Sequence, residues 1–534
     1  MKSVLAFPFP IRYGRAVRKR PFNRRRSFYS SATPSMIRKM YYNKTGGNKM
    51  SLCREKERKK EMKRIKFGTD GWRAVIAEDF TFANVRKVAR AIALYVRGTG
   101  LAEKGVVIGY DNRFLSERFA AAVAEVMAGS GIPCWLTVAA TPTPVTAYAV
   151  KALDTGGAVM ITASHNPPEY NGIKFIPDYA GPATTEITAA IERFLDTPET
   201  AEEVPIVLLE RGREQGLVRD LDARPLYLQH LRRLLDLHAI GRGRLRIVLD
   251  PMWGAGIGYV EEILKGVCSS IEVIHNHRDV LFGGALPEPT AAELSSLREM
   301  VLEKKADLGL ALDGDADRFG VIDRGGEYLS PNEVLALLLY YLLEHRRWRG
   351  AVARTLATTH LLDRIAEDYG LPVVETPVGF KYIGQSLIHH RSILGGEESG
   401  GMSIQGHIPE KDGILALVLI VEMISATGKS LRQLQEEIYE KFGRLVSARL
   451  DIKCDHEKKD EILKRLEGWY PAAVGGTPVA DRSTRDGVKL LLEDGSWILV
   501  RPSGTEPLFR VYVEAPSREV LQRLQESAKK DLGL

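Results

Sequence analysis

The stretch Thr162-Ala-Ser-His-Asn-Pro-Pro-Glu-Tyr-Asn-Gly-Ile-Lys174 directly follows an apolar run, Gly157-Ala-Val-Met-Ile161. The run has the length and composition of a buried strand. The asparagine, the prolines and the glycine of the longer stretch prevent it from closing into a helix. The strand therefore delivers a single hydroxyl, that of Ser164, into a short polar loop, which is a common way to present a nucleophile.

Two side chains near Ser164 can move protons. His165 adjoins it, and Lys174 lies ten residues further along the chain. Alone, Ser-His-Asn is also the composition of an ordinary turn. The whole string, together with three further loops, favours a site in which Ser164 carries a phosphate and not an acyl group.

An acidic loop follows another predicted strand. Leu308-Gly-Leu-Ala-Leu312 precedes Asp313-Gly-Asp-Ala-Asp-Arg318. Its alternate carboxylates can converge on one hard cation, and they would repel one another without it. An EF-hand is excluded because Arg318 stands where that loop needs its glycine. Carboxylates shared with a substrate phosphate suit Mg²⁺; the predicted ligands are Asp313, Asp315 and Asp317.

Two more loops have compositions suited to a sugar phosphate. Gly395-Gly-Glu-Glu-Ser-Gly-Gly401 offers carboxylates and a hydroxyl that can accept hydrogen bonds from sugar hydroxyls, although a plain surface loop would look similar. Val500-Arg-Pro-Ser-Gly-Thr-Glu-Pro-Leu-Phe-Arg510 combines arginines, hydroxyls and glycine-permitted backbone amides. That combination predicts an anion site for a phosphate group.

The loops occur in the order of those of the α-D-phosphohexomutases, the phosphoglucomutase/phosphomannomutase family, and the chain resembles that family from about Ile65 to its C-terminus. The resemblance implies an α/β fold of four domains, three of them related mixed α/β domains and the last a smaller α+β domain. We expect these boundaries: a disordered basic extension at 1–61, domain I with the serine loop at 62–213, domain II with the metal loop at 214–326, domain III with the sugar loop at 327–441, and domain IV with the phosphate loop at 442–534.

The resemblance also implies roles for individual residues. Ser164 would be a phosphoserine whose phosphate shares Mg²⁺ with the three aspartates, and glucose 1,6-bisphosphate would be activator and intermediate. Its catalytic companions would be Lys174, Arg73 and Arg318, and His165 joins them because it adjoins the serine. The substrate-binding residues that match the family are Glu397, Ser399, Arg501, Ser503, Gly504 and Thr505. To these we add Arg510, from the composition of its loop, and Gly379 and Lys381, from a turn that is a candidate to complete the sugar site.

At one position the chain departs from part of the family. Some members end the sugar loop with His where this chain has Gly401. The proton-transfer or orienting role placed on that His therefore cannot be carried over. The candidates to compensate are His407 and the Gly379-Phe-Lys381 turn.

Composition narrows the class of protein. The 534 residues are 44% hydrophobic and 27% charged, typical of globular proteins, and imply roughly three or four domains. The longest apolar runs, 334–343 and 414–421, are too short for a membrane span. Four cysteines without CxxC spacing favour a reducing compartment, and we expect a cytoplasmic monomer or dimer without a membrane partner.

The overall net charge of +7 comes from the N-terminal segment. Residues 1–61 hold 18 Lys/Arg and three Asp/Glu, a net charge of +15, so the remainder carries −8. Three interpretations stay open for this segment: a transit peptide, an arm for nucleic acid or an anionic surface, or an upstream in-frame extension before Met50 or Met62, which we favour. Nucleic-acid binding would rest on this segment alone.

From Ile65 the chain alternates helix-like and strand-like segments, the sign of α/β architecture. We expect helices at 82–97, 116–127, 331–344 and 359–369, strands at 106–110, 245–249 and 352–357, and a loop at 66–73. The glycines of 250–258 are spaced GxGxG, so they favour close helix–strand packing over a dinucleotide site.

Rival functions remain within and outside the family. Glucose phosphate is favoured over mannose phosphate on the TASHNP form of the serine loop and the Glu-Glu-Ser of the sugar loop, and the glucosamine-specific branch typically carries SASHN. A Mg²⁺-dependent phosphatase with Asp313 as its nucleophile is the enzymatic alternative. The phosphoserine mechanism requires an accessible Ser164 within about 10 Å of the aspartates, because direct metal coordination joins ligands at about 2 Å each.

Overall fold

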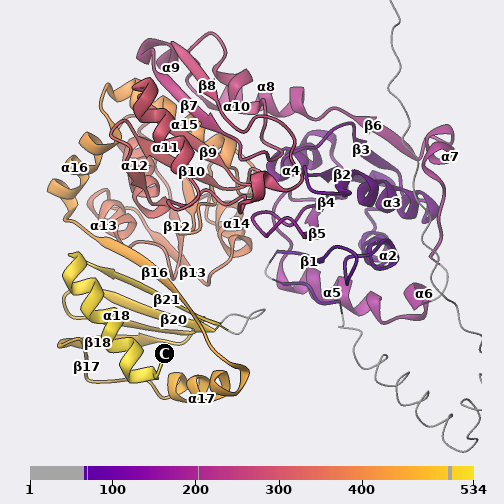
Figure 1. The fold of residues 1–534 in the computed structure, drawn as a ribbon. Helices are drawn as coiled ribbons and strands as arrows, with labels where there is room; N and C mark the ends of the chain where they lie inside the picture. Colours follow the sequence, from indigo (N-terminus) through magenta and orange to yellow (C-terminus); the bar gives the residue numbers. More distant parts are fainter. Residues whose placement is uncertain (1–64, 69, 202–203, 503–507) are drawn as a thin grey trace, which may run out of the picture. The chain divides into compact units, whose positions relative to one another are not determined.

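The computed structural model describes residues 65–68, 70–201, 204–502 and 508–534, so the predictions for the 1–61 extension and for Ser503, Gly504 and Thr505 lie outside the described residues. Four sheets follow one another along the chain (Figure 1). The first three are mixed or largely parallel and are flanked by helices, and the last is antiparallel. This arrangement confirms the predicted α/β class with a distinct last unit.

The first sheet has the strand order β1-β5-β4-β2-β3-β6 and presents the serine loop. Strand β4 lies parallel to β2 and antiparallel to β5. Its strands are β1 Trp72–Val75, β2 Val106–Tyr110, β3 Cys134–Thr137, β4 Gly157–Ile161, β5 Tyr170–Pro177 and β6 Val218–Leu221. Its helices are α2 Phe82–Gly98, η1 Ala102–Lys104, α3 Ser116–Gly129, α4 Thr143–Leu153, α5 Thr185–Leu195, α6 Pro198–Ala201 and α7 Leu209–Glu214.

The second sheet, in the order β11-β10-β9-β7-β8, presents the aspartate loop between β9 and β10. Every residue of β9 and β10 is buried, as expected for strands covered on both faces. Its strands are β7 Arg246–Asp250, β8 Ser270–Val273, β9 Leu308–Leu312, β10 Phe319–Asp323 and β11 Tyr328–Leu329. Its helices are α8 Arg224–Leu234, α9 Leu237–Gly243, α10 Tyr259–Leu264, η2 Phe282–Gly284 and α11 Ser295–Lys304.

The third sheet is smaller, in the order β13-β12-β14-β15, and the sugar loop joins β14 to β15. Its strands are β12 Val352–Thr355, β13 Val373–Thr376, β14 Leu394–Gly396 and β15 Met402–Ile404. Its helices are α12 Pro331–Glu344, α13 Leu361–Asp368, α14 Phe380–His389, α15 Gly413–Thr427 and α16 Leu431–Phe442. Side chains of α12 and α15 share one apolar core with those of α4, β7 and β9.

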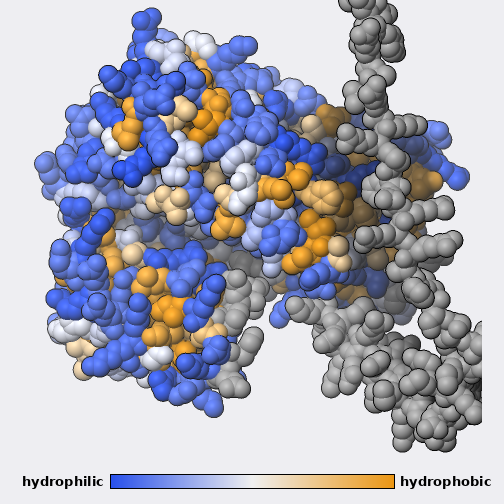
Figure 2. All heavy atoms as spheres, viewed as in Figure 1, coloured by the Kyte–Doolittle hydropathy of each residue, from blue (hydrophilic) through white to orange (hydrophobic). Residues whose placement is uncertain are grey.

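The last sheet, in the order β16-β21-β20-β19-β18-β17, has an apolar core of its own. Its strands are β16 Val446–Lys453, β17 Ala473–Val474, β18 Thr477–Ser483, β19 Val488–Leu492, β20 Trp497–Pro502 and β21 Leu508–Ala515, with helices α17 His456–Glu467 and α18 Arg518–Leu532. A small cluster that includes Leu356 and Trp497 packs this unit against the third. On the face in Figure 2 most described residues are hydrophilic, with apolar residues in smaller groups.

Most expected elements occur where the sequence predicts them, with some shifted ends. The helix expected at 359–369 begins at Leu361, because Thr358 Oγ pairs with Thr355 and Thr359 Oγ accepts a hydrogen bond from the Leu361 amide. The strand expected at 352–357 ends at Thr355 for the same reason.

Two expected loops contain strand residues. The loop expected at 66–73 gives way to β1 at Trp72, and the serine stretch becomes β5 from Tyr170. Both become extended because β5 pairs with β1 on one side and β4 on the other. The predicted domain boundaries stay predictions; β6 follows residue 213 and pairs with β3 in the first sheet.

Among the described helices, no single one is long and apolar enough to cross a membrane. One pair, Gly413–Thr427 with Leu431–Phe442, passes that test on length and composition, but it is bent by 79° at its break.

Candidate functional site

Ser164 lies in the loop after β4 and faces the aspartate loop. Its Oγ donates a hydrogen bond of 2.9 Å to Asp313 Oδ2 and lies 3.3 Å from His165 Nδ1. Its backbone is left-handed, with φ 53°, a conformation that is strained for a residue with a side chain. The serine and the aspartates therefore meet within the separation that the phosphoserine mechanism requires.

The expectation that Ser164 is accessible is wrong for this conformation, because the residue is only 1% exposed. The two loops approach so closely that a Cβ on Gly314 would lie 2.6 Å from the Ser164 carbonyl oxygen. Only glycine permits that approach. A substrate must therefore displace side chains or separate loops before it reaches the hydroxyl.

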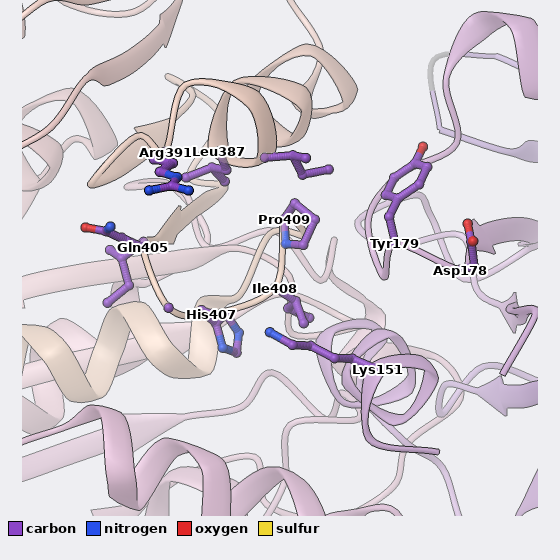
Figure 3. A pocket seen from close by; sticks show the side chains of 12 residues that line it. Lys151, Asp178, Tyr179, Leu387, Arg391, Gln405, His407, Ile408 and Pro409 are labelled. Atoms are coloured by element: carbon purple, nitrogen blue, oxygen red, sulfur yellow. The ribbon is translucent and has the colours of Figure 1, made fainter. Parts of the chain in front are cut away.

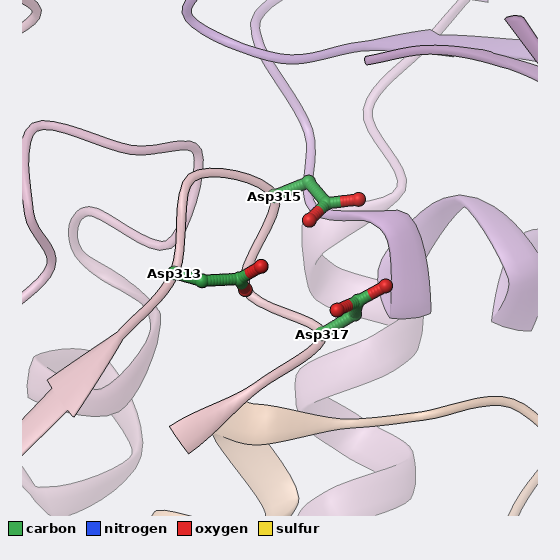
Figure 4. A group of neighbouring side chains, drawn as sticks. All are labelled: Asp313, Asp315 and Asp317. Carbon is green, nitrogen blue, oxygen red and sulfur yellow. The ribbon is translucent and has the colours of Figure 1, made fainter. Parts of the chain in front are cut away.

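The three aspartates converge as predicted. One ligand atom from each of Asp313, Asp315 and Asp317 lies within 4.8 Å of the others, and all three side chains are buried. Figure 4 shows the carboxylates on one side of the loop between β9 and β10. Within the described part of the chain, Oδ1 of Asp315 and Oδ1 of Asp317 are buried and accept no hydrogen bond. Buried carboxylate oxygens of this kind fit a divalent cation that prefers oxygen ligands.

The pKa values of the aspartates reflect both their mutual repulsion and the cations beside them. Burial and the neighbouring carboxylates of Asp315 and Asp317 raise the pKa of Asp313 well above its usual range. Burial would also raise the pKa of Asp315, but the ammonium of Lys174 and the hydroxyl of Thr143 hold it below its usual value. Cationic side chains therefore balance part of the acidic charge.

Lys174 supplies most of that balance. It projects from β5, with Nζ 2.9 Å from Asp315, 3.2 Å from Asp317 and 3.0 Å from Asp70. Burial alone would lower the pKa of Lys174, but these carboxylates raise it well above its usual range. The side chain is therefore a protonated ammonium at neutral pH.

His165 and the predicted arginines surround the serine loop. Burial and the charges of Arg318, Arg73 and Lys174 lower the pKa of His165 well below its usual value, so the ring is neutral. Arg73 donates a 2.6 Å hydrogen bond to the Asn166 side chain. Arg318 pairs with Glu288 at 3.2 Å, and its backbone amide donates to Asp313.

Lys411 occupies the space beside Gly401. It was not among the candidates predicted to compensate for the missing histidine, which were His407 and the Gly379-Phe-Lys381 turn. A Cβ on Gly401 would lie 2.5 Å from Cδ of Lys411. Lys411 Nζ lies 3.2 Å from both Asp70 and Asp317. Although burial opposes it, those carboxylates raise the pKa of Lys411. Lys411 thus brings a second ammonium to the aspartate loop.

His407 belongs to a different group of side chains. Its ring is buried between His230, at 2.9 Å, and Asp412, at 2.8 Å. It also lines a cavity of about 630 Å³ whose other walls include Lys151 and Arg391 (Figure 3). None of the predicted catalytic or metal residues lines that cavity.

The sugar loop is less open than its glycines suggest. Glu397 accepts a 2.9 Å hydrogen bond from the Gly379 amide, which brings two predicted sugar-binding positions together. Burial and the neighbouring Glu398 raise the pKa of Glu397 to about 7. Ser399 is half-buried in the turn, and Lys381 Nζ donates to Thr185 Oγ at 3.0 Å.

The predicted phosphate-binding arginines lie opposite each other on β20 and β21, where Arg501 pairs with Arg510. Like charges directly opposite on a sheet are unfavourable unless an anion offsets them. Asp486 lies 2.8 Å from Arg501 and, against the effect of burial, raises its pKa. Asp486 thus orients the Arg501 guanidinium.

Sequence reasoning missed Asp70 and Lys411. Asp70 stands one residue before Gly71, and Lys411 lies between Glu410 and Asp412 in a charged run that separates two apolar segments. A charged run directly before the buried helix α15 is the signal that could have marked Lys411.

Four family descriptions match the sequence in order. They are phosphoglucomutase/phosphomannomutase alpha/beta/alpha domain I at residues 64–202, domain II at 225–326, domain III at 330–442 and the C-terminal domain at 451–530.

Whole-length relatives carry several substrate names. A phosphoglucomutase/phosphomannomutase of Thermococcus kodakarensis is 30% identical over 455 residues, covering 85% of this chain and 95% of the relative. A "Probable phosphoglucosamine mutase" of Pyrococcus abyssi is 33% identical, covering 87% and 97%. A phosphoglucomutase of Komagataeibacter xylinus is 29% identical, covering 85% and 87%.

Solved structures share the fold over the same length. A Thermus thermophilus structure described as a phosphomannomutase has a TM-score of 0.77 at 35% identity and covers 88% of this chain and 99% of its own. The structure of Aspergillus fumigatus N-acetylphosphoglucosamine mutase has been solved in complex with GlcNAc-6P and magnesium. It has a TM-score of 0.52 at 15% identity, and the match covers 92% of this chain and 98% of the fungal chain. A serine-to-alanine variant of that fungal enzyme has been solved in complex with glucose 1,6-bisphosphate. Its TM-score is 0.51 at 15% identity, and the match covers 89% of this chain and 95% of the fungal chain. With serine, aspartate, sugar and arginine loops carried in order by four matching domains, this chain belongs to the phosphoglucomutase/phosphomannomutase family of phosphohexomutase enzymes.

Proposed function

We propose that this enzyme interconverts hexose 1-phosphate and hexose 6-phosphate, with Ser164 as the carrier of the phosphoryl group. The observation that supports this most is the 2.9 Å contact between Ser164 Oγ and Asp313, which joins the serine loop to a convergent set of carboxylates. A phosphoryl group on that oxygen would lie directly beside the aspartates and the two lysine ammoniums.

Asp313, Asp315 and Asp317 are the residues that would hold Mg²⁺, and the buried Oδ1 atoms of Asp315 and Asp317, which accept no hydrogen bond, fit it. The ion would supply positive charge against the phosphate oxygens. A. fumigatus N-acetylphosphoglucosamine mutase, whose solved structure contains magnesium with a sugar phosphate, supports this choice.

The transfer proceeds in two symmetrical halves. The bond between phosphorus and Ser164 Oγ breaks as the free sugar hydroxyl forms a new one, and that hydroxyl gives up its proton. The product is a hexose 1,6-bisphosphate, which turns end over end and returns its other phosphate to Ser164. The bisphosphate seen in the serine-to-alanine variant of the fungal enzyme supports this intermediate.

Charge neutralisation must contribute most of the catalysis. Enzymes accelerate phosphate-monoester hydrolysis by up to about 10²¹-fold, and proton transfer supplies only about 10²–10⁴ of such factors. Lys174, Lys411, Arg73 and Arg318 surround the hydroxyl or the aspartates with fixed positive charge. These charges are pre-oriented by ion pairs and hydrogen bonds, so they need little rearrangement when the phosphoryl group moves.

Lys174 and His165 divide the proton handling. The protonated Lys174 is suited to act as an acid toward a leaving oxygen. The neutral His165 ring, 3.3 Å from Ser164 Oγ, can accept a proton or orient the phosphate. Lys174 remains the first choice, because its contacts reach two of the aspartates directly.

The ends of the sugar phosphate are held elsewhere. Glu397 and Ser399, with Gly379 and Lys381 beside them, would bind the sugar hydroxyls. Arg501, Ser503, Gly504, Thr505 and Arg510 would bind the phosphate that is not reacting. A bisphosphate that turns over needs such a second anion site, because either end must be retained while the other reacts.

Glucose is the sugar we favour, because the serine loop reads TASHNP and the sugar loop Glu-Glu-Ser. A relative named as a phosphoglucomutase supports this choice, while relatives named for mannose and glucosamine phosphates keep those sugars as competitors. Parallel assays on glucose, mannose and glucosamine 1-phosphates decide the preference, and a kcat/KM for glucose below that for either competitor overturns it.

The function is tested by assaying the purified chain for glucose 1-phosphate conversion with Mg²⁺ and a trace of glucose 1,6-bisphosphate. Intact-mass analysis should find one phosphate on the peptide that contains Ser164. A phosphatase that uses Asp313 would instead release inorganic phosphate and leave Ser164 unmodified. That second outcome would replace the mutase proposal.

A further inference from the structure

Arg113, which the catalytic scheme above does not use, is bonded to the backbone of the serine loop. It follows β2 and its side chain is completely buried, which is rare for arginine unless the group is fully paired. One guanidinium nitrogen donates 2.6 Å hydrogen bonds to the carbonyls of Ser164 and Asn166. Another donates to the carbonyls of Pro167, at 2.8 Å, and Tyr170, at 3.1 Å.

The serine loop needs such a partner. Two prolines remove backbone donors, and Ser164 adopts a left-handed conformation. Buried carbonyl groups without a strand or helix partner are costly unless another donor reaches them. The planar guanidinium, with its donors in a fixed fork, serves four carbonyls of the loop at once.

Arg113 is itself fixed from several sides. Its Nε lies 3.3 Å from Asp111 Oδ2, and both side chains are fully buried. Asp111 Oδ1 accepts hydrogen bonds from the Arg113 amide and from Ser116 Oγ. The ring of Phe282 lies 5.0 Å from the guanidinium carbon. The group therefore has little freedom to follow a displaced serine loop.

The neighbouring Asn112 reaches toward the aspartate loop. Its side-chain amide donates to the carbonyls of Trp253, at 2.9 Å, and Gly254, at 2.8 Å. The next amide, of Ala255, donates to the carbonyl of Gly314, at 2.9 Å. Gly314 directly follows Asp313, so the path from Asn112 ends beside the carboxylate that contacts Ser164.

We infer that the Asn112-Arg113 turn is a positioning element that sets the separation between Ser164 and the aspartate loop, Arg113 by holding the first loop and Asn112 by holding the second. The inference rests on the proposed function, in which phosphoryl transfer depends on that separation. Small displacements of reacting groups reduce the rate strongly without weakening substrate binding in proportion. The turn should therefore govern kcat more than KM.

The test compares Arg113→Lys and Arg113→Ala with Arg346→Lys and Arg346→Ala. Arg346 is a matched control because it makes a bidentate pair with the buried Glu422 and its hydrogen bonds reach none of the site residues. We expect kcat for glucose 1-phosphate to fall about 100-fold in Arg113→Lys, with KM within about threefold. The Arg346 variants should lose thermal stability while keeping kcat within about threefold.

Chemical rescue separates positioning from general stability. Guanidinium at low, non-denaturing concentration should raise kcat of Arg113→Ala at least about tenfold, because the free ion can donate to the same carbonyls. The same additive should leave the wild type and Arg346→Ala unchanged. If Arg113→Ala does not fold, Arg113→Lys carries the test, and a folded Arg113→Lys enzyme with wild-type kcat overturns the inference.

Asn112→Ala tests the other side of the turn. Because both residues fix one distance, the double variant Asn112→Ala/Arg113→Lys should lose less activity than the product of the single losses. Multiplicative losses would overturn the shared role.

Hydrogen–deuterium exchange gives a readout independent of activity. Peptides covering 162–172 should exchange faster in Arg113→Lys and unchanged in Arg346→Lys. Unchanged exchange in Arg113→Lys would overturn the hold on the serine loop. Exchange could rise as expected while the wild type has neither mutase activity nor phosphate on Ser164. In that case the proposed function is wrong, but the inference that Arg113 holds the serine loop in place is supported.

Discussion

The serine–aspartate region and the arginine pair of the last sheet both handle phosphate in the proposed reaction, but they differ in burial and in charge balance. Around Ser164, the side chains of Asp313, Asp315 and Lys174 are at most 3% exposed; Lys174 and Asp315 form an ion pair, and Asp313 accepts hydrogen bonds. Arg501 and its partner Asp486 keep 16% and 22% of their side chains exposed. In the proposed reaction, the first region would react with the phosphate, and the second would bind and release one.

The largest effect should come from the reacting oxygen itself. Ser164→Ala is expected to lower mutase activity more than about 10⁴-fold, because no other group can carry the phosphoryl. Ser399→Ala, in the sugar loop, should retain measurable turnover. Circular dichroism should show both variants folded, and near-native activity in Ser164→Ala would remove the contrast between the two regions.

Lys411→Met tests whether the second ammonium contributes to the reacting region. The change leaves Asp317 and Asp70 with one cation fewer, and we expect kcat to fall about 100-fold. Lys489→Met is the matched control, since Lys489 is a buried lysine of the last sheet that pairs with Glu375. If both variants lose activity equally, burial and not the aspartate loop accounts for the effect.

Arg501→Ala tests the binding region. Losing a charge-assisted hydrogen bond to phosphate should raise KM about 10- to 100-fold and leave the Mg²⁺ concentration for half-maximal activity unchanged. Steady-state titrations of substrate and metal measure both quantities. Arg482→Ala, whose guanidinium bonds to backbone carbonyls of Glu467 and Trp469, should change neither. A shift in metal dependence would place Arg501 with the reacting region instead.

The smallest expected effect concerns stability and pH. Burial, together with the neighbouring Glu398, raises the folded-state pKa of Glu397 from 4.5 to about 7, so the folded protein holds this proton more tightly than the unfolded chain. That contribution to stability is complete below about pH 4.5 and is lost as the pH rises through 7. Glu397→Gln should therefore gain about 2–3 kcal/mol on the wild type between pH 4.5 and pH 8.

Denaturant unfolding at both pH values measures this difference. Glu398→Gln is the comparison, because it removes only the contribution of the neighbouring charge and should gain less. An equal gain in the two variants would mean that the burial of Glu397 is not its cause.

The elements of the fold were predicted best where pattern and packing agree. The strand at 308–312 and the helix at 331–344 occur with the expected ends, because each combines an apolar pattern with clear end signals. The helix that begins at Leu361 was shifted by hydroxyl hydrogen bonds of Thr358 and Thr359, which no periodicity records.

The candidate site could be predicted in its residue types but not in its contacts. The resemblance to the family implied that Ser164 and the aspartates meet, and the structure brings them within hydrogen-bond distance. Asp70, Lys411 and Arg113 were missed because their partners lie up to 341 residues away in sequence. Long-range pairs of this kind depend on how the sheets dock, which local propensity does not encode.

The packing of Lys411 against Gly401 has an evolutionary consequence. A histidine introduced at 401 would collide with the lysine stem, so the change alone should harm the enzyme. Shortening the lysine alone would remove an ammonium from two aspartates. Each single change should therefore lower the activity or stability of the enzyme. A lineage that has replaced one of these two residues is expected to have replaced the other as well.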